Sequence, residues 1–370
     1  MRSKAKSSGT RVKVAVGLSG GVDSSVAALK LVEGGYDVTG VHMRCWDYDS
    51  PGCKGNEDRA DAIKIAAKLN ISFVELNFEE EYKARVLNYF YNEIKLGRTP
   101  NPDVVCNQEI KFGLFLDWAI DKDFDYVATG HYARIEEIAI KNPKTNTKVK
   151  IRRLMSGIDA SKDQSYFLYK LNEKQLAYIL YPIGQLTKTG VRKIAKEAGL
   201  HNWGKKDSTG ICFIGDVDFS EFVKREVDVK EGDVLDLNGE IVGKHKGVQL
   251  YTIGQRHGFE LTKYQGVPVY VVEKDVKANT LTIGFGKDAQ RNEFEVSDVN
   301  WINESIKPKG KTLKCLVRIR NLGEKMPAKI TPKSDSNLTV SLQDYALGVA
   351  PGQSAVFYAG DTVLGGSTIV

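Results

Sequence analysis

Residues 14–28 read VAVGLSGGVDSSVAA and decide the fold of the first half of the chain. The stretch passes from an apolar run through glycines and serines into an apparent helix, a pattern typical of a phosphate-binding loop. Gly20 and Gly21 let backbone N–H groups turn toward a ligand, and the helix that follows offers its positive end to an anion. A P-loop of the GxxxxGK[ST] type carries a lysine for the outer phosphates, but Ser19–Ser25 contains none.

The missing lysine indicates which phosphate reacts. Without a cation that directs attack to the γ-phosphate, we expect chemistry at the α-phosphate, with pyrophosphate as the leaving group that the loop holds. Asp23 stands beside the expected phosphates and is a candidate ligand for Mg²⁺. The alternative is a generic glycine loop, which the position of SGGVDSS directly between strand and helix disfavours.

The first half of the chain alternates strand and helix patterns. The predicted strands are Val12–Val16, Asp37–Met43, Ser72–Leu76 and Asp125–Thr129, and the predicted helices are Val22–Glu33, Glu57–Leu69 and Glu79–Lys95. This order predicts an α/β fold with a doubly wound parallel sheet that helices cover on both faces. Ligands of such sheets bind beyond the carboxyl ends of the strands, where Ser19–Ser25 and Thr129–Ala133 fall. The polar stretch Ile138–Lys150 predicts a surface hairpin or loop, and two further helices follow it.

The pattern changes after Asp216. DFSEFVKRE is typical of a helix, Asn238-Gly239 is a strong hairpin signal, and short strands with turns continue to the C-terminus. We therefore expect a nucleotide-binding catalytic domain over residues 1–216, a small β-rich domain over 217–285 and a C-terminal β-barrel or sandwich over 286–370.

The segment KTLKCLVRIRN in the last domain alternates with a period of two. Its apolar face carries Leu313, Cys315, Val317 and Ile319. Arg318 and Arg320 point the other way, either as part of a solvated sheet face or as contacts to phosphates.

Composition narrows the class of protein. The chain has 370 residues, 42% hydrophobic and 27% charged, which is ordinary for a globular protein. A net charge of +6, from 53 basic and 47 acidic residues, favours a polyanionic partner only weakly. No apolar run approaches the ~18 residues of a membrane span. The basic start MRSKAKSSGTR lacks a secretory apolar segment and is either a disordered tail or a targeting remnant, so we expect a cytoplasmic or organellar-matrix protein.

Cysteines and histidines are scattered. Five cysteines without a CxxC pair suit a reducing compartment, and neither they nor the five histidines have the spacing of a zinc or iron–sulfur site. We therefore expect no structural metal.

Several blocks carry a family resemblance. SGGVDSS is similar to the signature of the PP-loop ATP pyrophosphatases, which adenylate an oxygen and release pyrophosphate. GRTPNPDVVCNQEIKFG, ATGHYAR, KDQSYFLY, KKDSTGICFIG, YTIGQRHG and PGQSAVFY, in this order, resemble the tRNA-specific 2-thiouridylases, which thiolate the wobble uridine of tRNA. The resemblance covers nearly the whole chain. It implies a PP-loop domain of the adenine nucleotide α-hydrolase type, a small β-rich domain and a C-terminal β-barrel that binds tRNA.

The resemblance also implies site residues. ATP contacts map onto Gly17, Leu18, Ser19, Gly20, Gly21, Val22, Asp23, Ser24, Met43 and Gly130. Contacts to the target base map onto Asn101, Pro102 and Asp103. Other tRNA contacts map onto His131, Lys162, Asp163, Gln164, Arg318, Ile319 and Gln353. Ile319 departs from the family, which usually has tyrosine there, so a stacking or hydroxyl contact is not expected at this position.

Thiol chemistry is the remaining expectation. Cys212 resembles the family's persulfide carrier and Cys106 its partner nucleophile, which would attack the persulfide, release sulfide and leave a disulfide. Taken singly, each cysteine would more often be a buried hydrophobe. Asp103 lies in a turn set up by Pro100 and Pro102 and is a candidate acid or base, or an Asx-type turn residue. Cys45 and Cys53 receive no catalytic role.

Two classes of alternative stay open. Another PP-loop tRNA-modifying enzyme is possible, although glutamine-fed synthetases need an amidotransferase domain and cluster-dependent thiouridylases need CxxC pairs. The other alternative is a non-catalytic nucleotide- and RNA-binding protein with structural cysteines. For the thiolation reading, we expect ATP and Mg²⁺ as cofactors, tRNA as substrate, and a cysteine desulfurase or sulfur-relay protein as persulfide donor.

Overall fold

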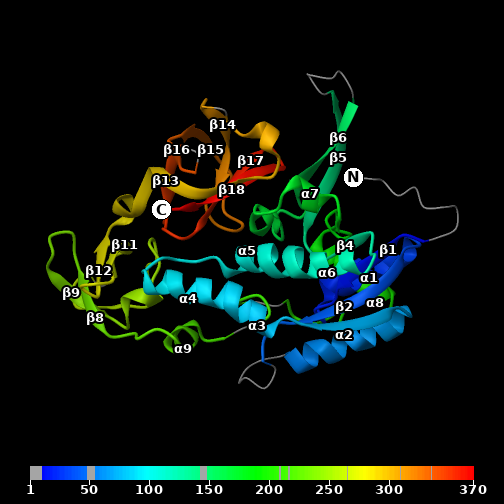
Figure 1. Cartoon of the computed structure of the whole chain (residues 1–370). Coiled ribbons are helices and arrows are strands. Elements are labelled where there is room, and N and C mark those ends of the chain that lie inside the picture. Colours follow the sequence, from blue (N-terminus) through cyan, green and yellow to red (C-terminus); the bar gives the residue numbers. More distant parts are fainter. Residues whose placement is uncertain are drawn as a thin grey trace. The chain divides into compact units, whose positions relative to one another are not determined.

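The computed structural model of the chain describes residues 11–47, 55–141, 148–207, 210–215, 217–264, 266–308, 310–334 and 336–370 (Figure 1). Contacts divide the chain into two compact units. Unit 1 comprises Met1–Tyr82 with Cys106–Asp216, and unit 2 comprises Lys83–Val105 with Val217–Val370. Among the described residues, no helix has the length and apolar character to cross a membrane.

Unit 1 is built on a parallel sheet with strand order β3-β2-β1-β4-β7. The strands are β1 (Lys13–Gly17), β2 (Asp37–Arg44), β3 (Ser72–Asn77), β4 (Tyr126–Ala128) and β7 (Ile179–Leu180). The predicted parallel sheet is confirmed, and the ends of the four predicted strands differ from the observed ends by at most one residue. The carboxyl ends of β1, β2 and β4 share one edge, so the loops after these strands gather there.

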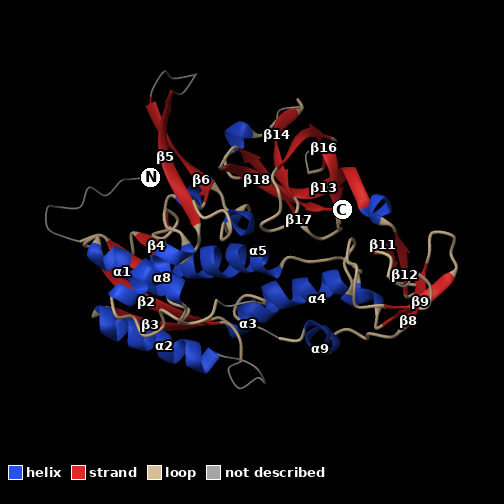
Figure 2. Cartoon of the chain, turned by 180° about the vertical axis from the view of Figure 1, so that it is seen from behind, coloured by secondary structure: helices blue, strands red, loops and turns tan. Residues whose placement is uncertain are grey.

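Helices cover both faces of this sheet (Figure 2). On one face, Val14 and Val16 pack in a core with α1 (Val22–Glu33), α2 (Gly55–Leu69) and α8 (Lys188–Glu197). On the other, a Cβ at Gly17 would lie 3.8 Å from a ring carbon of Phe115 in α6. The remaining helices of unit 1 are α3 (Glu79–Tyr82), η2 (Asn107–Leu114), α6 (Phe115–Asp121), η3 (Ser165–Leu168) and α7 (Glu173–Leu176). The doubly wound fold is therefore confirmed.

The hairpin expected over Ile138–Lys150 is present. Strand β5 (Ala133–Lys141) pairs antiparallel with β6 (Lys148–Ser156). The tip of the predicted loop, residues 142–147, lies outside the described residues.

The long helix predicted over Glu79–Lys95 is interrupted. It consists of α3, a π-helical segment η1 (Lys83–Leu87) and α4 (Asn88–Lys95). A π-helix bonds i to i+5 instead of i to i+4, a local change that the apolar periodicity of a short window does not reveal.

The turn predicted at Asp103 is wrong. Pro102 is the first residue of helix α5 (Pro102–Cys106), and Asn101 Oδ1 accepts the Val104 amide over 3.3 Å. Proline suits the first helical position because its missing N–H has no partner there, and asparagine is a favoured N-cap. The Asx-type role therefore belongs to Asn101. Asp103 stands in the first turn of a helix that continues into η2 and α6.

Unit 2 contains a five-stranded sheet with order β10-β9-β8-β12-β11. Its strands are β8 (Gly232–Leu235), β9 (Ile241–His245), β10 (Glu260–Leu261), β11 (Tyr270–Asp275) and β12 (Thr280–Gly284). The helix predicted in DFSEFVKRE is α9 (Phe219–Lys224), which Asp218 caps through the Glu221 amide. The Asn238-Gly239 hairpin is confirmed between β8 and β9, with Gly239 at φ +81.

The C-terminal strands of unit 2 close into an antiparallel barrel. Strands β13, β16, β15, β14, β17 and β18 are neighbours in this order, and β18 pairs with β13. They span β13 (Gln290–Trp301), β14 (Leu313–Arg318), β15 (Met326–Pro332), β16 (Leu338–Leu347), β17 (Ser354–Ala359) and β18 (Thr362–Ile369). Among the described residues of this unit are also three short 3₁₀ helices: η4 (Val248–Leu250), η5 (Gly286–Ala289) and η6 (Glu304–Ile306). The structure thus selects a barrel over a sandwich.

Candidate active site

The glycine–serine loop after β1 is held by its own hydroxyl groups. Ser24 Oγ accepts the Ser19 amide over 3.2 Å and donates to the Gly21 carbonyl oxygen over 3.1 Å. Ser25 Oγ donates to the same carbonyl oxygen over 2.9 Å. The first N–H groups of α1 have no acceptor within the helix, so they are open to an anion at the loop.

Neighbouring backbone packs tightly against this loop. Gly20 has φ +73, and a Cβ there would lie 2.3 Å from the Asp58 carbonyl oxygen. A Cβ at Gly130, after β4, would lie 2.6 Å from the Ser24 amide nitrogen. Asn202 Nδ2 donates to the Gly20 carbonyl oxygen over 2.9 Å, while its Oδ1 is buried with no hydrogen-bond partner in the described chain. The loop is therefore a close-fitting cradle with one open acceptor beside it.

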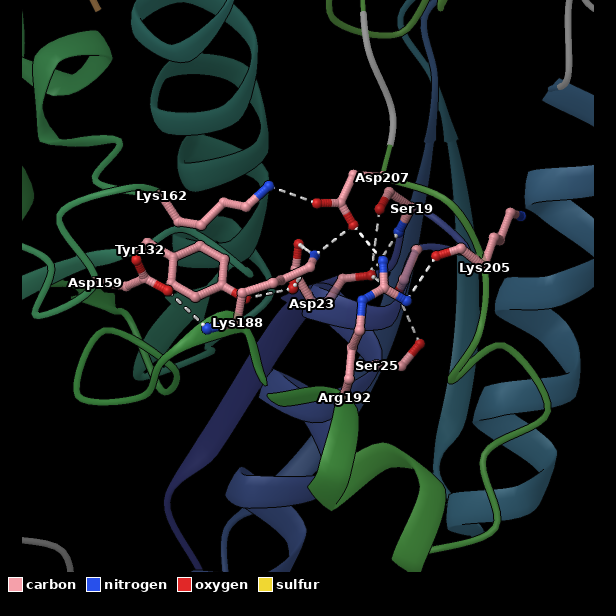
Figure 3. A network of polar contacts seen from close by, with 12 residues as sticks. Ser19, Asp23, Ser25, Tyr132, Asp159, Lys162, Lys188, Arg192, Lys205 and Asp207 are labelled. Atoms are coloured by element: carbon pink, nitrogen blue, oxygen red, sulfur yellow. Dashed lines mark hydrogen bonds and ion pairs between the residues drawn. The ribbon is translucent and has the colours of Figure 1, made fainter. Parts of the chain in front are cut away.

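A lysine from a distant part of the sequence lies at the loop (Figure 3). Lys188, the first residue of α8, places Nζ 2.9 and 2.8 Å from the two carboxylate oxygens of Asp23 and 2.8 Å from Asp207. Tyr132 donates its hydroxyl to Asp23 over 2.7 Å. The Lys188 side chain is only 12% exposed, so its charge acts where solvent screens it little.

Asp207 gathers three cations. Its carboxylate lies 2.7 Å from Lys162 Nζ, 2.8 Å from Lys188 Nζ and 2.6 Å from Arg192 Nη2. Burial alone would raise the pKa of Asp207, but hydrogen bonds from Lys162 and Lys188 lower it to about 2. Three cations thus converge on Asp207 beside the loop, and one of them, Lys188, also binds Asp23. Lysine and arginine side chains gathered in this way suit a polyphosphate.

The segment before Asp207 is fastened to helix α2. Lys205 Nζ lies 2.8 Å from Asp58 and 2.6 Å from Asp61, and His201 Nε2 lies 2.9 Å from Asp61. Burial lowers the pKa of Lys205, but its two aspartate partners outweigh that effect and raise it. These bonds fix the wall of the loop on the side of α2.

The charged side chains that line the loop were not predicted from the sequence. The unassigned residues are Asn202, Lys188, Arg192, Lys205 and Asp207. Lys205 and Asp207 stand in the block KKDSTGICFIG, so the resemblance offered a signal for them. For Lys188, the only signal in the sequence was its position at the start of a helix, directly after the N-cap residue Thr187.

Cys106 and Cys212, far apart in the sequence, meet in unit 1. Both are thiols, and their side chains are hydrogen bonded to each other. Cys106 is fully buried at the end of α5, whereas Cys212 is partly exposed. Cys212 is therefore the more exposed of the two residues, and Cys106 lies against it from the buried side.

A tight turn presents Cys212. Ile211 and Gly215 form a β-bridge, and Phe213 adopts φ +68, a strained conformation for a bulky residue. The Tyr82 hydroxyl donates to the Cys212 carbonyl oxygen over 2.6 Å, and the Tyr82 ring packs edge-on against Phe213 at 5.9 Å. Such strain at one residue is typical of functional turns.

The charged groups around the thiols have opposite effects on the pKa values of the cysteines. Burial raises the pKa of Cys106 well above its ordinary value, the neighbouring Cys212 adds to the rise, and the charge of Lys111 lowers it. Cys45, buried directly after β2, shows the same pattern with Glu79 and Glu81 as further raising charges. The structure thus brings Cys45, which had no predicted role, near the thiol pair, while Cys53 lies outside the described residues.

The residues predicted to contact tRNA from unit 1 are largely engaged inside it. His131 is 7% exposed, lies 2.7 Å from Thr129 Oγ1 through Nδ1, and has a pKa well below its ordinary value because of burial. Asp163 is 2% exposed and accepts two backbone amides, and Gln164 Oε1 accepts the Tyr132 amide. Their tRNA contacts stay predictions.

The barrel residues are also placed. Val317 and Ile319 are in the barrel core, and Leu313 and Cys315 pack against it, which confirms the apolar face. The solvated reading of Arg318 is wrong: the residue is 8% exposed, and its guanidinium carbon lies 5.4 Å from the centroid of the Tyr358 ring. Backbone groups of Gln353 pair with Ala350 and Ile369, and those of Arg318 with β17.

Metal-binding residues do not cluster. Within the described part of the chain, no three His, Cys, Asp or Glu side chains converge on a point that could hold a metal ion. Two pairs of carboxylates in the described network share a lysine: Asp23 and Asp207 both bind Lys188, and Asp58 and Asp61 both bind Lys205.

Known families match the three parts of the chain. Residues 12–216 match the family described as tRNA methyl transferase HUP domain. Residues 220–285 match a tRNA methyl transferase PRC-barrel domain, and residues 291–369 match an aminomethyltransferase β-barrel domain. The sheet, the loop at its carboxyl edge and the first of these matches define an ATP-using enzyme of the PP-loop class.

Relatives along the full length narrow this class. A protein of Geobacillus thermodenitrificans named tRNA-specific 2-thiouridylase MnmA is 45% identical over 362 residues, which cover 96% of this chain and 94% of the relative. A protein of Listeria innocua with the same name is 44% identical over 363 residues, covering 97% and 94%. The chain belongs to the tRNA-specific 2-thiouridylase family.

Proposed function

We propose that this chain catalyses the ATP-dependent 2-thiolation of the wobble uridine of tRNA. Uridine O2 is adenylated with release of pyrophosphate, and sulfur carried as a persulfide on Cys212 then replaces the activated oxygen, giving 2-thiouridine and AMP. The observation that carries the proposal is the contact between Cys106 and Cys212 in the same unit as the SGGVDSS loop. The relatives' names support it.

The adenylation half uses the loop and the charged wall. ATP would bind with its phosphates on Ser19–Ser24, near Met43 and Gly130, where the buried Asn202 oxygen and the tight glycines leave a shaped cradle. Lys188, Arg192 and Lys162 supply positive charge for the departing pyrophosphate.

Asp23 and Asp207 are the residues that would hold Mg²⁺. Their carboxylates stand beside the loop, and Mg²⁺ typically takes one or two carboxylates together with substrate phosphates. When bound, Mg²⁺ supplies charge neutralisation to the phosphates.

The sulfur half uses the two thiols. The Cys106 thiolate attacks the inner sulfur of the Cys212 persulfide, the bond to the outer sulfur breaks, and HS⁻ leaves as the Cys106–Cys212 disulfide forms. HS⁻ adds to C2 of the adenylated uridine, and AMP departs with the oxygen. A thiol reductant returns the disulfide to two thiols. A cysteine desulfurase or sulfur-relay protein would load Cys212, which is the more exposed of the two.

Substrate contacts complete the proposal. Asn101, Pro102 and Asp103 would meet the target base, with Asp103 as acid or base three residues before Cys106 on one helix. Arg318 and Gln353 of the barrel would contact tRNA. We also place the enzyme in the cytoplasm or an organellar matrix.

The descriptions of two matched domains contain the words methyl transferase, which would suggest methyl transfer to tRNA. The pair of thiols favours sulfur transfer over methyl transfer.

Mass spectrometry of nucleosides from tRNA incubated with enzyme, Mg-ATP and a persulfide donor tests the proposal. We expect 2-thiouridine together with pyrophosphate. Methylated uridine, release of γ-phosphate, or unmodified tRNA would overturn it, the last favouring a non-catalytic binding protein.

A further inference from the structure

We propose that Lys111 is a positioning residue that holds Cys106 in its thiolate form for attack on the sulfur carried by Cys212. This inference rests on the proposed function and deepens it, because neither the motif resemblance nor the phosphate site assigns a role to Lys111.

The winding of the helix places Lys111 near the thiols. Cys106 ends α5, and the π-helix η2 begins at the next residue. In an α-helix, residues five apart would be turned by about 140° from each other. The i→i+5 bonds of a π-helix instead bring residues five apart close together across one turn. π-Helical turns are frequent at functional sites for this kind of reason.

A second contact directs the Lys111 side chain toward Cys212. Its Nζ lies 5.5 Å from the ring centroid of Phe213, the residue after Cys212. Phe213 is itself held by Tyr82, which also fixes the Cys212 carbonyl group. The ammonium therefore stands beside the turn that presents one thiol and on the helix that carries the other.

The charged and titratable groups that act on Cys106 differ in the sign of their effect on its thiolate. Cys212 and Cys45 are the other titratable groups that act on it, and both disfavour a second negative charge. Glu79 and Glu81 add negative charge around Cys45, and burial keeps the pKa of His131 well below its ordinary value. Lys111 is the one cation among these groups that acts on Cys106, and it acts on Cys45 and His131 as well. In a buried site, an opposite charge at short range is the main means of favouring a thiolate.

The pH dependence of sulfur release tests this role. Enzyme that carries a persulfide on Cys212 is incubated in the absence of tRNA at a series of pH values from acidic to alkaline. At each pH, the rate of sulfide release and the rate of formation of the Cys106–Cys212 disulfide are measured. For Lys111→Met, we expect the rising limb of the rate profile to move to higher pH. A shift of about one pH unit makes the reaction about tenfold slower at neutral pH, with recovery at alkaline pH.

Two further variants serve as controls. Lys111→Arg keeps the charge and should keep the wild-type profile. Lys196→Met removes a lysine from a similar cation–ring pair, 4.8 Å from the Trp203 ring. Lys196 is not among the charges that act on Cys106 or Cys45, so this variant should also leave the profile unchanged. Loss by the same factor at every pH, or an unshifted profile in Lys111→Met, overturns the inference.

The same samples separate this inference from the proposed function. Addition of Mg-ATP and tRNA to the wild-type enzyme reports 2-thiouridine formation. Absence of 2-thiouridine with a shifted release profile in Lys111→Met would contradict the proposed function and support the role of Lys111. Formation of 2-thiouridine with an unshifted release profile in Lys111→Met would support the proposed function and contradict the role of Lys111.

Discussion

Lys188 completes the candidate phosphate site, although the residues around it in the sequence give no sign of this role. Its ammonium contacts Asp23, at the start of α1, and Asp207, which follows α8. The loop sequence lacks a lysine, and the fold provides one from another segment. This position explains how a lysine-free loop can stabilise a pyrophosphate leaving group.

Replacing Lys188 should slow adenylation. In Lys188→Met, we expect the single-turnover rate of pyrophosphate formation to fall about 100-fold, because one preorganised charge at the leaving group is lost. Pyrophosphate is measured after mixing enzyme with Mg-ATP and tRNA. Lys193→Met is the matched control on the same helix, since the Lys193 side chain is 75% exposed and should not affect the rate. Equal rates for the two variants would contradict the role of Lys188.

Site residues were predictable where their signal is local. The spacing of SGGVDSS indicates a loop because glycine and serine at those positions leave few other conformations. Lys188 and Arg192 carry no such signal, because a lysine or arginine on a helix usually faces solvent and only tertiary packing shows its partner. Cys106 and Cys212 were predicted through resemblance, and their contact depends entirely on the fold.

At the scale of elements, the segment after β4 lies close to the start of α1, and this close approach fixes the position of the glycine–serine loop. A Cβ at Gly130 would lie 2.6 Å from the Ser24 amide nitrogen and 2.8 Å from the Asp23 carbonyl carbon. Both neighbours are backbone atoms, so a side chain at Gly130 can be accommodated only if strand and helix separate.

Gly130→Ala should therefore weaken both the fold and ATP binding. We expect a loss of about 1–3 kcal/mol in the free energy of unfolding, as for other overpacked sites, together with a higher Kd for ATP. Urea unfolding and calorimetric titration measure the two effects. Gly204→Ala is the control, because a Cβ there meets nothing within 4 Å. The prediction fails if both variants unfold and bind ATP alike.

Elements were predictable to different degrees. Strands β1 to β4 and helix α1 follow from apolar runs and turn residues, and their bounds differ little from the prediction. Helix α5 was mistaken for a turn because proline and asparagine occur both in turns and at helix starts. The π-helical segments η1 and η2 were not predicted, since one additional residue per turn hardly alters the apolar pattern of a short helix.

At the scale of the whole molecule, the charge balance bears on tRNA. The net charge of +6 is small, and some positive side chains, such as that of Arg318 over the Tyr358 ring, are buried. Affinity for tRNA should nevertheless rest on phosphate contacts, which release counterions. The division of the chain between two compact units, with Lys83–Val105 joined to the C-terminal part, was not predictable from element patterns because it depends on long-range packing.

Salt should weaken tRNA binding. Between low and physiological salt we expect the Kd for tRNA to rise at least about tenfold, with a linear dependence of log K on log salt concentration. Filter binding or fluorescence anisotropy measures this. Binding that is indifferent to salt would contradict recognition through phosphates.

Sulfur transfer in this enzyme depends on the pairing of Cys106 with Cys212. A single turnover of enzyme loaded with persulfide on Cys212, with Mg-ATP and tRNA, tests it when nucleosides and disulfide-linked peptides are quantified together by mass spectrometry. We expect one Cys106–Cys212 disulfide for each 2-thiouridine, and neither product in Cys106→Ser. Formation of 2-thiouridine without that disulfide, or at the wild-type rate in Cys106→Ser, would contradict it.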